Sequence, residues 1–263
     1  MAGWAKIGGN MRQFLWMVWL FVAASGASAQ TVFQFPEDEE ESAFIANEVI
    51  ATFYHELGHA MIDVLQLPVL GKEEDAADHL SVILMNDIWE EEAAANILAS
   101  DATAYALLAA QREAGGQEPS YSDEHSMDMQ RYYSVVCLFY GANPEARQGL
   151  ADELGLPPER AERCPEEWQA AAGSWDAVLS DAMPGGDNKG LVMQPGQEGQ
   201  PLADLIAEEV VAINERFGLP LEVSVVVADC GEANAYYSPS QQTITICNEY
   251  AQNLQAMWET SPD

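Results

Sequence analysis

Two histidines, His55 and His59, stand four residues apart inside a segment whose apolar residues recur at helical spacing. The apolar stripe extends from Phe44 to Val64 and predicts one long amphipathic helix. Residues four apart project from the same face of a helix, so both imidazoles can reach a single metal ion. A buried helix face carries such polar groups only when they have a partner. The pattern therefore predicts a long buried helix that holds a metal site.

Glu56 directly follows the first histidine and completes the pattern H-E-x-x-H. Successive residues of a helix are rotated by about 100°, so Glu56 can lie beside the metal ion without binding it. A carboxylate in that place can take a proton from a zinc-bound water and pass it to a leaving amine. The pattern is a recognised metalloprotease signal, and Glu56 is the candidate catalytic base.

A catalytic zinc ion needs a third protein ligand and an open position for water. The next predicted helix starts at about Glu73, after a turn that contains Pro and Gly. Glu74 and Asp78 are four residues apart on one face of that helix, and the turn is long enough to fold it back against the first helix. Glu73 is the rival third ligand. The alternative interpretation of all these acids is a solvated acidic surface.

This arrangement resembles the gluzincin metallopeptidases, in which H-E-x-x-H is followed by a helix with E-x-x-A-[DN] or E-x-x-x-D. The matching stretch here runs from Glu74 to Asp78. The resemblance implies that His55, His59 and Glu74 bind Zn²⁺ and that Asp78 orients a ligand histidine. The chain is also similar to a bacterial family of metallopeptidases of unknown substrate, and the segments that carry this similarity are 54–60, 67–78, 123–126, 230–237 and 247–249.

His125 is a further candidate for the active site. It lies near the start of a helix predicted from about Asp123. Some gluzincins use a distant histidine to stabilise the tetrahedral oxyanion, and the resemblance implies this role for His125. Arg131 and Tyr132 are alternatives, and a structural contact of His125 with carboxylates at helix ends is the other interpretation. We expect His79 to lie on the surface.

The first 29 residues have the layout of a secretory signal peptide. Lys6 and Arg12 precede an apolar run from Phe14 to Ala24, and Ala27-Ser28-Ala29 fits a cleavage site. This run is too short to span a bilayer. We therefore expect cleavage after Ala29, one mature domain over residues 30–263, and a secreted or periplasmic protein. We predict no further segment that inserts stably into a membrane.

The charge balance limits the partners of the chain. The sequence has 43 Asp and Glu residues against 10 Lys and Arg, a formal net charge of −33. An acidic surface of this kind repels phosphate backbones and anionic membranes, which argues against nucleic-acid binding. High salt would screen the self-repulsion, so a saline habitat would suit such a protein. The oligomeric state is left open.

The four cysteines predict two disulfides, because an even number of cysteines in an exported chain is typical of disulfide pairing. Cys137 and Cys164 flank a short predicted helix. Cys230 and Cys247 come close if a β-hairpin joins the segments between them. We therefore expect the pairs Cys137–Cys164 and Cys230–Cys247.

Helical periodicity dominates the chain until about Phe217, after which apolar residues alternate with period two. The strand at Ala233–Tyr237 and the following strand predict a hairpin in which Tyr237 lies opposite Gln242. The segment Met183–Pro201 is predicted to be a surface loop or lid. We therefore expect a mostly helical α+β fold, zincin-like, with a small C-terminal antiparallel sheet packed on the active helix. Its strand at Ala233–Tyr237 is the candidate edge that holds a peptide substrate.

These observations favour a zinc-dependent metallopeptidase that hydrolyses a peptide or related amide bond in a peptide or protein substrate. An exported binding protein with a non-catalytic zinc site is the alternative; a site saturated with protein ligands would favour it, whereas the presence of Glu56 favours the enzyme. A third possibility is an acidic interaction protein of saline environments, which predicts no tightly bound metal.

Overall fold

The computed structural model describes residues 32–180 and 188–261. The predicted signal peptide and its cleavage site lie outside these residues. The helices are α1 (Glu39–Val64), α2 (Glu73–Ile88), α3 (Glu91–Ala114), α4 (Asp128–Ala142), α5 (Pro144–Glu153), α6 (Pro158–Ala161), α7 (Cys164–Leu179), α8 (Pro201–Arg216) and α9 (Asn248–Glu259). The strands are β1 (Leu191–Met193), β2 (Val223–Ala228), β3 (Ala235–Ser238) and β4 (Thr243–Cys247).

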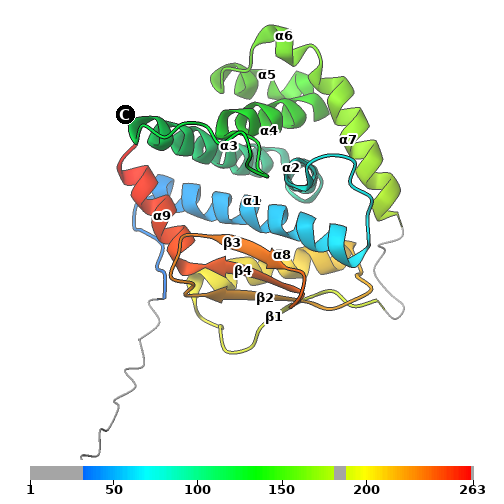
Figure 1. Cartoon of the computed structure of the whole chain (residues 1–263), viewed down its shortest axis with the longest axis vertical. Coiled ribbons are helices and arrows are strands. Elements are labelled where there is room, and N and C mark those ends of the chain that lie inside the picture. The colour runs from blue at the N-terminus through cyan, green and yellow to red at the C-terminus, as the bar shows by residue number, and fades with distance from the viewer. Residues whose placement is uncertain (1–31, 181–187, 262–263) are drawn as a thin grey trace, which may run out of the picture. The chain divides into compact units, whose positions relative to one another are not determined.

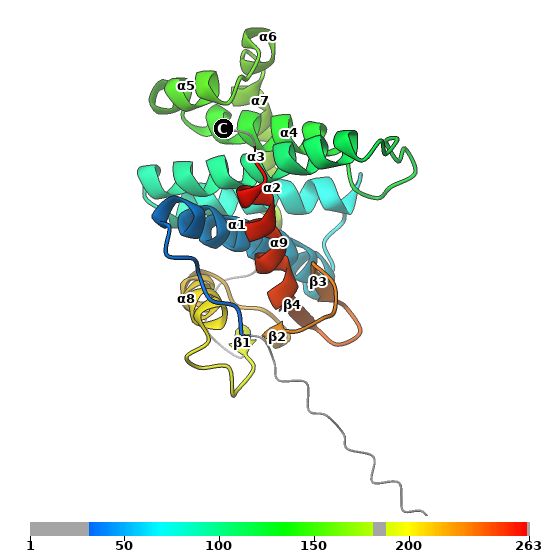
Figure 2. The ribbon, with the colours of Figure 1, turned by 90° about the vertical axis from the view of Figure 1, so that its left-hand side faces the viewer.

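Helix α1 lies between helices α2, α3 and α4 on one side and the sheet with α8 and α9 on the other (Figures 1 and 2). On one side it packs against α2 and α3, and on the other against α8, α9, β3 and β4. Its apolar residues are buried almost completely, among them Phe53 and Leu57. Polar contacts fix it to the C-terminal part, because the Tyr54 hydroxyl donates to Glu209 of α8 and the Tyr250 hydroxyl of α9 donates to Glu48. A helix held on both sides is a rigid platform for a site.

Helix α1 begins five residues before Phe44, where the apolar stripe in the sequence starts. Asp38 caps the helix, and its carboxylate accepts hydrogen bonds from the backbone N–H groups of Glu40 and Glu41. Three glutamates occupy the first turn, where negative charge is favoured by the partial positive charge of a helix N-terminus. Glu39, Glu40 and Glu41 therefore form the first helical turn.

Helix α3 is long and apolar enough, by length and composition alone, to cross a membrane. The sequence analysis predicted no such segment in the mature chain. In the structure α3 packs against α1 and α4 and carries the buried carboxylate of Asp101. Core helices of soluble proteins share this length and composition, and the contacts of α3 are those of a core helix.

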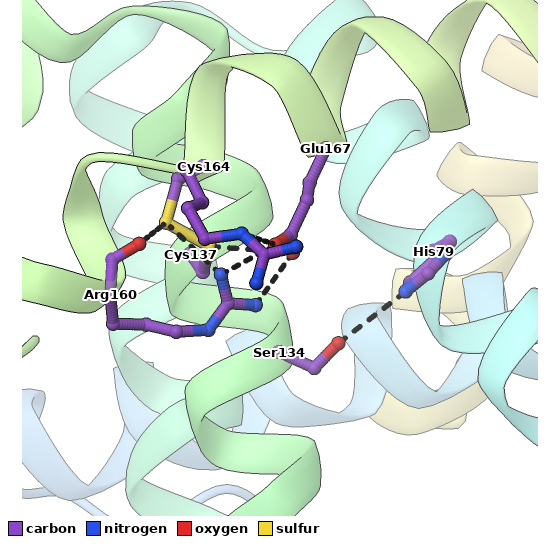
Figure 3. Close-up of a disulfide and its surroundings, with 7 residues drawn as sticks. His79, Ser134, Cys137, Arg160, Cys164 and Glu167 are labelled. Carbon is purple, nitrogen blue, oxygen red and sulfur yellow. Dashed lines mark hydrogen bonds and ion pairs between the residues drawn. A yellow bond between two sulfur atoms is a disulfide. The ribbon is translucent and has the colours of Figure 1, made fainter.

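A disulfide joins α4 to α7 (Figure 3). It links Cys137 to Cys164, the predicted pair, and Arg160 of α6 forms two hydrogen bonds with Glu167 beside it. One turn earlier on the same side of α4, the Ser134 hydroxyl lies 3.4 Å from His79 of α2 (Figure 3). His79 is therefore half-buried between two helices rather than on the surface, and burial lowers its pKa.

The four strands form one mixed sheet in the order β1-β2-β4-β3. Strand β2 runs parallel to both β1 and β4, and only β3 is antiparallel to its neighbour β4. The sequence analysis expected an antiparallel sheet, and this is correct only for the β3–β4 pair. Strand β1 also lies inside the segment 183–201 that was expected to be a loop; within that segment, residues 183–187 are outside the described part. Helix α8 connects β1 to β2, as a parallel pair requires.

The β3–β4 hairpin differs in register from the prediction, because Tyr237 lies opposite Ile244 instead of Gln242. Gln242 has a φ of 52°, a left-handed conformation typical of turns, so it belongs to the turn and not to the strand. The shift is two residues, which leaves every side chain on its expected face. The second predicted disulfide, Cys230–Cys247, is present despite the shift.

Two disulfides and no free cysteine among the described residues are typical of proteins from oxidising compartments. This agrees with an extracellular or periplasmic protein.

Candidate metal centre

The middle of α1 presents His55 and His59 on one face, one turn apart. Their Nε2 atoms are 3.2 Å from each other, and the two side chains are only 11% and 13% exposed. Because α1 is packed on both sides, its backbone fixes the separation of the two rings. Two imidazole nitrogens thus point at nearly the same place.

Helix α2 brings the carboxylate of Glu74 to that place. Its Oε2 atom lies 3.2 Å from Nε2 of His55 and 3.3 Å from Nε2 of His59. Gly58 of α1 permits this approach, because a Cβ at that position would be only 2.9 Å from the Cα atom of Ala77 in α2. Glycine is disfavoured inside a helix by about 1 kcal/mol relative to alanine. The close contact of α1 and α2 explains its presence between the two histidines.

This contact yields a prediction for Gly58→Ala. The added methyl group must push α2 away from α1, so we expect the free energy of unfolding to fall by roughly 1–3 kcal/mol. The affinity for the metal ion that this cluster would hold should fall by on the order of 10- to 100-fold, the scale of changes that misplace a ligand without removing it. Denaturant unfolding and chelator competition measure the two effects. Gly149→Ala is the matched control, because no atom lies within 4 Å of the Cβ built there; equal losses in the two variants would refute the packing argument.

The outer nitrogen of each ring faces its own carboxylate. His55 Nδ1 is 2.8 Å from Oδ1 of Asp78, and His59 Nδ1 is 2.8 Å from Oε1 of Glu73. An ionised carboxylate only accepts hydrogen bonds, so in the neutral imidazole the proton lies on Nδ1 and the lone pair of Nε2 is directed inward. This is the way in which carboxylates orient metal-binding histidines in proteins.

The inward atoms therefore meet as a cluster of lone pairs. Glu74 Oε2 is buried and has no well-directed hydrogen-bond donor among the described residues, although several Nε2 atoms surround it. In the neutral imidazoles, lone pairs this close to a carboxylate are repelled unless a cation, either a proton or a metal ion, lies between them. Imidazole nitrogen and carboxylate oxygen are also the ligand atoms that zinc prefers. The residues of the site fit a bound metal ion.

The electrostatic field of the site also favours a cation. Burial raises the pKa of Glu74, but the neighbouring imidazoles of His125, His55 and His59 lower it well below its usual range. Burial lowers the pKa of His55, whereas Asp78 and Glu74 raise it to about 10. The surrounding carboxylates therefore favour positive charge at the centre of the cluster.

Glu56 lies next to this cluster but outside the set of converging atoms. Only 7% of the residue is exposed, and burial raises the pKa of its carboxylate, while His55, His59 and the backbone of Tyr237 lower it. The contact with Tyr237 places Glu56 against β3, at the edge of the sheet. A buried carboxylate with a raised pKa beside a metal site is suited to proton transfer near neutral pH.

His125 reaches the same cluster from a loop. Its Nε2 atom is 3.0 Å from Oε2 of Glu74, and its Nδ1 atom is 3.3 Å from Oδ1 of Asp123. The prediction that Asp123 begins a helix is wrong, because α4 begins at Asp128. Asp123 instead accepts a hydrogen bond from the backbone N–H of His125, which is a local turn and not a helix cap. His125, His55 and Glu74 offer ligand atoms that all lie within 4.8 Å of one another.

Arg131 and Tyr132 lie in different surroundings, although they are adjacent in the sequence. Arg131 forms two hydrogen bonds with Asp78 and lies 4.5 Å from the centre of the Tyr105 ring. It therefore acts on the site through Asp78, the partner of His55. The Tyr132 hydroxyl donates to the carbonyl of Leu154, away from the cluster.

Sequence reasoning missed two acidic residues. Glu73 was considered only as a rival ligand, whereas the structure places it on the outer nitrogen of His59. Asp101 was not considered at all, because a single acid in an alanine-rich helix gives no signal. It is buried near Asp78 and Arg131, and burial together with the charge of Asp78 raises its pKa to about 7.

A second group of potential metal ligands, formed by Cys230, Cys247 and Glu249, has another explanation. The two cysteines form a disulfide. The carboxylate of Glu249 accepts hydrogen bonds from the backbone N–H groups of Cys230 and Gly231. The histidine cluster is therefore the metal site that the described residues support.

Comparison with known protein families gives one match. The model of a family described as "Putative metallopeptidase" matches residues 17–179 and 197–262. No curated protein and no solved structure matches the chain.

Proposed function

Because the chain belongs to this metallopeptidase family, we propose that it is a zinc-dependent peptidase of the gluzincin type with Glu56 as its general base. The observation that carries the proposal is the convergence of His55, His59 and Glu74 beside a buried glutamate that is not part of the cluster. These three residues would hold the metal ion. Asp78 and Glu73 would orient the two histidines.

A bound zinc ion supplies a Lewis acid that activates water and polarises the carbonyl of the scissile bond. Glu56 accepts the proton of the attacking water and passes it to the leaving amine. Burial raises the pKa of Glu56 towards neutral pH, which suits a group that must both accept a proton from water and give it to the amine. His55 and His59 keep their protons on Nδ1, towards Asp78 and Glu73, so that their inner nitrogens stay free to bind the metal.

The edge of the sheet offers a binding site for an extended peptide. Strand β3 lies at the edge and packs against α1. The N–H of Cys247 donates to the carbonyl of Asn234, and hydrogen-bonded pairs alternate along an antiparallel ladder. Ala235 and Tyr237 therefore direct their backbone groups away from β4. The Tyr237 backbone donates to Glu56, which leaves the N–H and carbonyl of Ala235 to pair with a substrate strand beside Glu56.

A cavity of about 690 Å³ adjoins the metal centre on the side of α3 and α4. We propose that it receives a side chain of the substrate. Its lining combines apolar side chains, among them Leu108, Met127, Met129 and Tyr133, with charged ones such as Arg112, Glu118 and Arg131. This lining suits a large side chain with an apolar body and a polar end.

The central test is metal dependence. We expect the purified mature protein to contain stoichiometric zinc and to cleave a subset of an unbiased peptide library. Chelation should abolish cleavage, and added zinc should restore it, because the metal ion supplies the Lewis acid. Mass spectrometry of the products and elemental analysis measure both. A protein that retains cleavage after complete loss of metal would refute the proposal.

The edge strand gives a second test, Ala235→Pro. The substitution removes an N–H that faces away from β4, so we expect the fold and zinc content to persist. Peptide turnover should fall by roughly 3- to 10-fold, the value of one hydrogen bond. Ala235→Val keeps the N–H and is the control. Full turnover in the proline variant would show that this amide does not hold substrate, and unfolding would place the strand inside the sheet.

The alternative function is that of an exported zinc protein without catalysis. One observation favours it, the approach of His125 to the cluster, because a fourth protein ligand closes a zinc site to water. The position of Glu56 favours the enzyme, since a structural zinc site does not require a buried carboxylate beside it. Zinc without cleavage of any peptide would support the alternative.

A further inference from the structure

His125 differs from the other members of the cluster in its support. His55, His59 and Glu74 belong to helices, and their side chains are at most 14% exposed. The side chain of His125 is 45% exposed and belongs to the loop that joins α3 to α4. Residues 115–125 of that loop are all exposed, so few apolar contacts hold them in place.

Two side chains nevertheless dock this loop onto the start of α2. The Lys72 ammonium donates to the carbonyl oxygens of His125 and Asp123, at 2.9 and 3.3 Å. The hydroxyl of Ser126 donates to Asp75 at 2.7 Å. On the α2 side these contacts are made by Lys72 and Asp75, which lie on either side of Glu74 in the sequence. The loop is therefore held against the helix that supplies the metal ligand, by polar contacts at the surface.

The two nitrogens of the His125 ring both face carboxylates, which only accept hydrogen bonds: Nδ1 is 3.3 Å from Asp123 and Nε2 is 3.0 Å from Glu74. His125, His55 and Glu74 offer ligand atoms that all lie within 4.8 Å of one another. When Glu74 binds a metal ion through this oxygen, the neutral ring keeps its proton on Nδ1, towards Asp123, and Nε2 presents a lone pair to the same ion. A lone pair can bind a metal ion but cannot donate to an oxyanion. The same arrangement occurs at His55 and His59.

We propose that His125 is a fourth, displaceable ligand of the same metal ion, so that the resting site is closed and opens when the loop between α3 and α4 lifts. This inference rests on the proposed function. A zinc ion with four protein ligands has no position for water. The exposed loop ligand leaves more easily than the three helical ones, and its departure frees the position that hydrolysis needs.

The test measures the zinc environment directly. X-ray absorption on the zinc-loaded mature chain counts the imidazole ligands, and chelator competition gives the affinity. We expect three imidazoles in the wild type and two in His125→Ala, with an affinity lowered about 10-fold or more. Peptide turnover of His125→Ala at saturating zinc should rise, because the open position no longer depends on the loop.

Lys72→Met is the matched variant, since it keeps His125 and removes one anchor of the loop. It should retain three imidazoles and show faster turnover. An unchanged imidazole count and affinity in His125→Ala, with turnover lowered by about 10²–10³-fold, would make His125 an oxyanion donor and overturn the proposal. If the number of imidazole ligands falls from three in the wild type to two in His125→Ala, but no variant cleaves any peptide, only the peptidase function is refuted. A wild type that binds no zinc would refute both.

Discussion

Replacing Glu56 with Gln should lower kcat/KM for peptide cleavage by about 10²–10⁴-fold, the usual contribution of a general base, and leave zinc bound. Glutamine has nearly the same shape, and its amide oxygen can still accept the hydrogen bond that the Tyr237 backbone offers. It cannot take up the proton of the attacking water. Because Glu56 is not among the converging atoms, its replacement does not remove a metal ligand.

Steady-state cleavage of a library-derived peptide and elemental analysis measure the two effects on one preparation. Glu209→Gln is the matched control, because Glu209 is also buried but accepts a hydrogen bond from Tyr54 between α1 and α8. Its turnover should stay near that of the wild type. Loss of zinc from Glu56→Gln would make Glu56 a ligand, and undiminished turnover would place the base elsewhere.

Replacing Glu74 with Ala should abolish tight zinc binding, whereas Glu73→Ala should weaken it by only about 10- to 100-fold. The carboxylate of Glu74 meets the inner nitrogens of His55 and His59, so its loss removes a ligand. The carboxylate of Glu73 meets the outer nitrogen of His59 and is 51% exposed, so its loss frees a ring that remains able to bind.

The two adjacent glutamates control for each other, since both lie in the first turn of α2 and carry the same charge. Chelator competition with zinc gives the affinities, and circular dichroism checks the fold. Asp78→Asn should resemble Glu73→Ala, because Asp78 plays the same part for His55. If Glu73→Ala lost zinc and Glu74→Ala kept it, the third ligand would move by one residue.

The helical part of the site could be predicted because helical geometry is local. Four-residue spacing alone places His55 and His59 on one face, and the pair Glu74 and Asp78 follows from the same rule. The sequence analysis expected α2 to fold back against α1, but helical periodicity did not reveal how closely the two helices approach. It depends on Gly58 facing Ala77, a contact between residues whose pairing no periodicity reveals.

The contributions of loops and strand pairing could not be predicted with the same success. The loop before α4 positions His125 through Lys72 and Asp123, contacts that join separate segments. Strand β1 has only three residues, too short for an alternation to be recognised among glycines and prolines. The parallel pairing of β2 with β4 also depends on which strand lies next to which, and this is decided by packing on α1 and α8.

The central place of α1 has a consequence for the order in which the chain folds. Its helical partners α2 and α3 follow it directly, but the contacts of Tyr54 with Glu209 and of Thr52 with Tyr250 span 155 and 198 residues. Contacts so distant in sequence form slowly. If the chain crosses a membrane from its N-terminus, as the predicted signal peptide requires, α1, α2 and the histidine cluster form before β3 has crossed. The proposed peptide-binding edge is then completed only when the whole chain has arrived, so an incomplete chain would not yet cleave its neighbours.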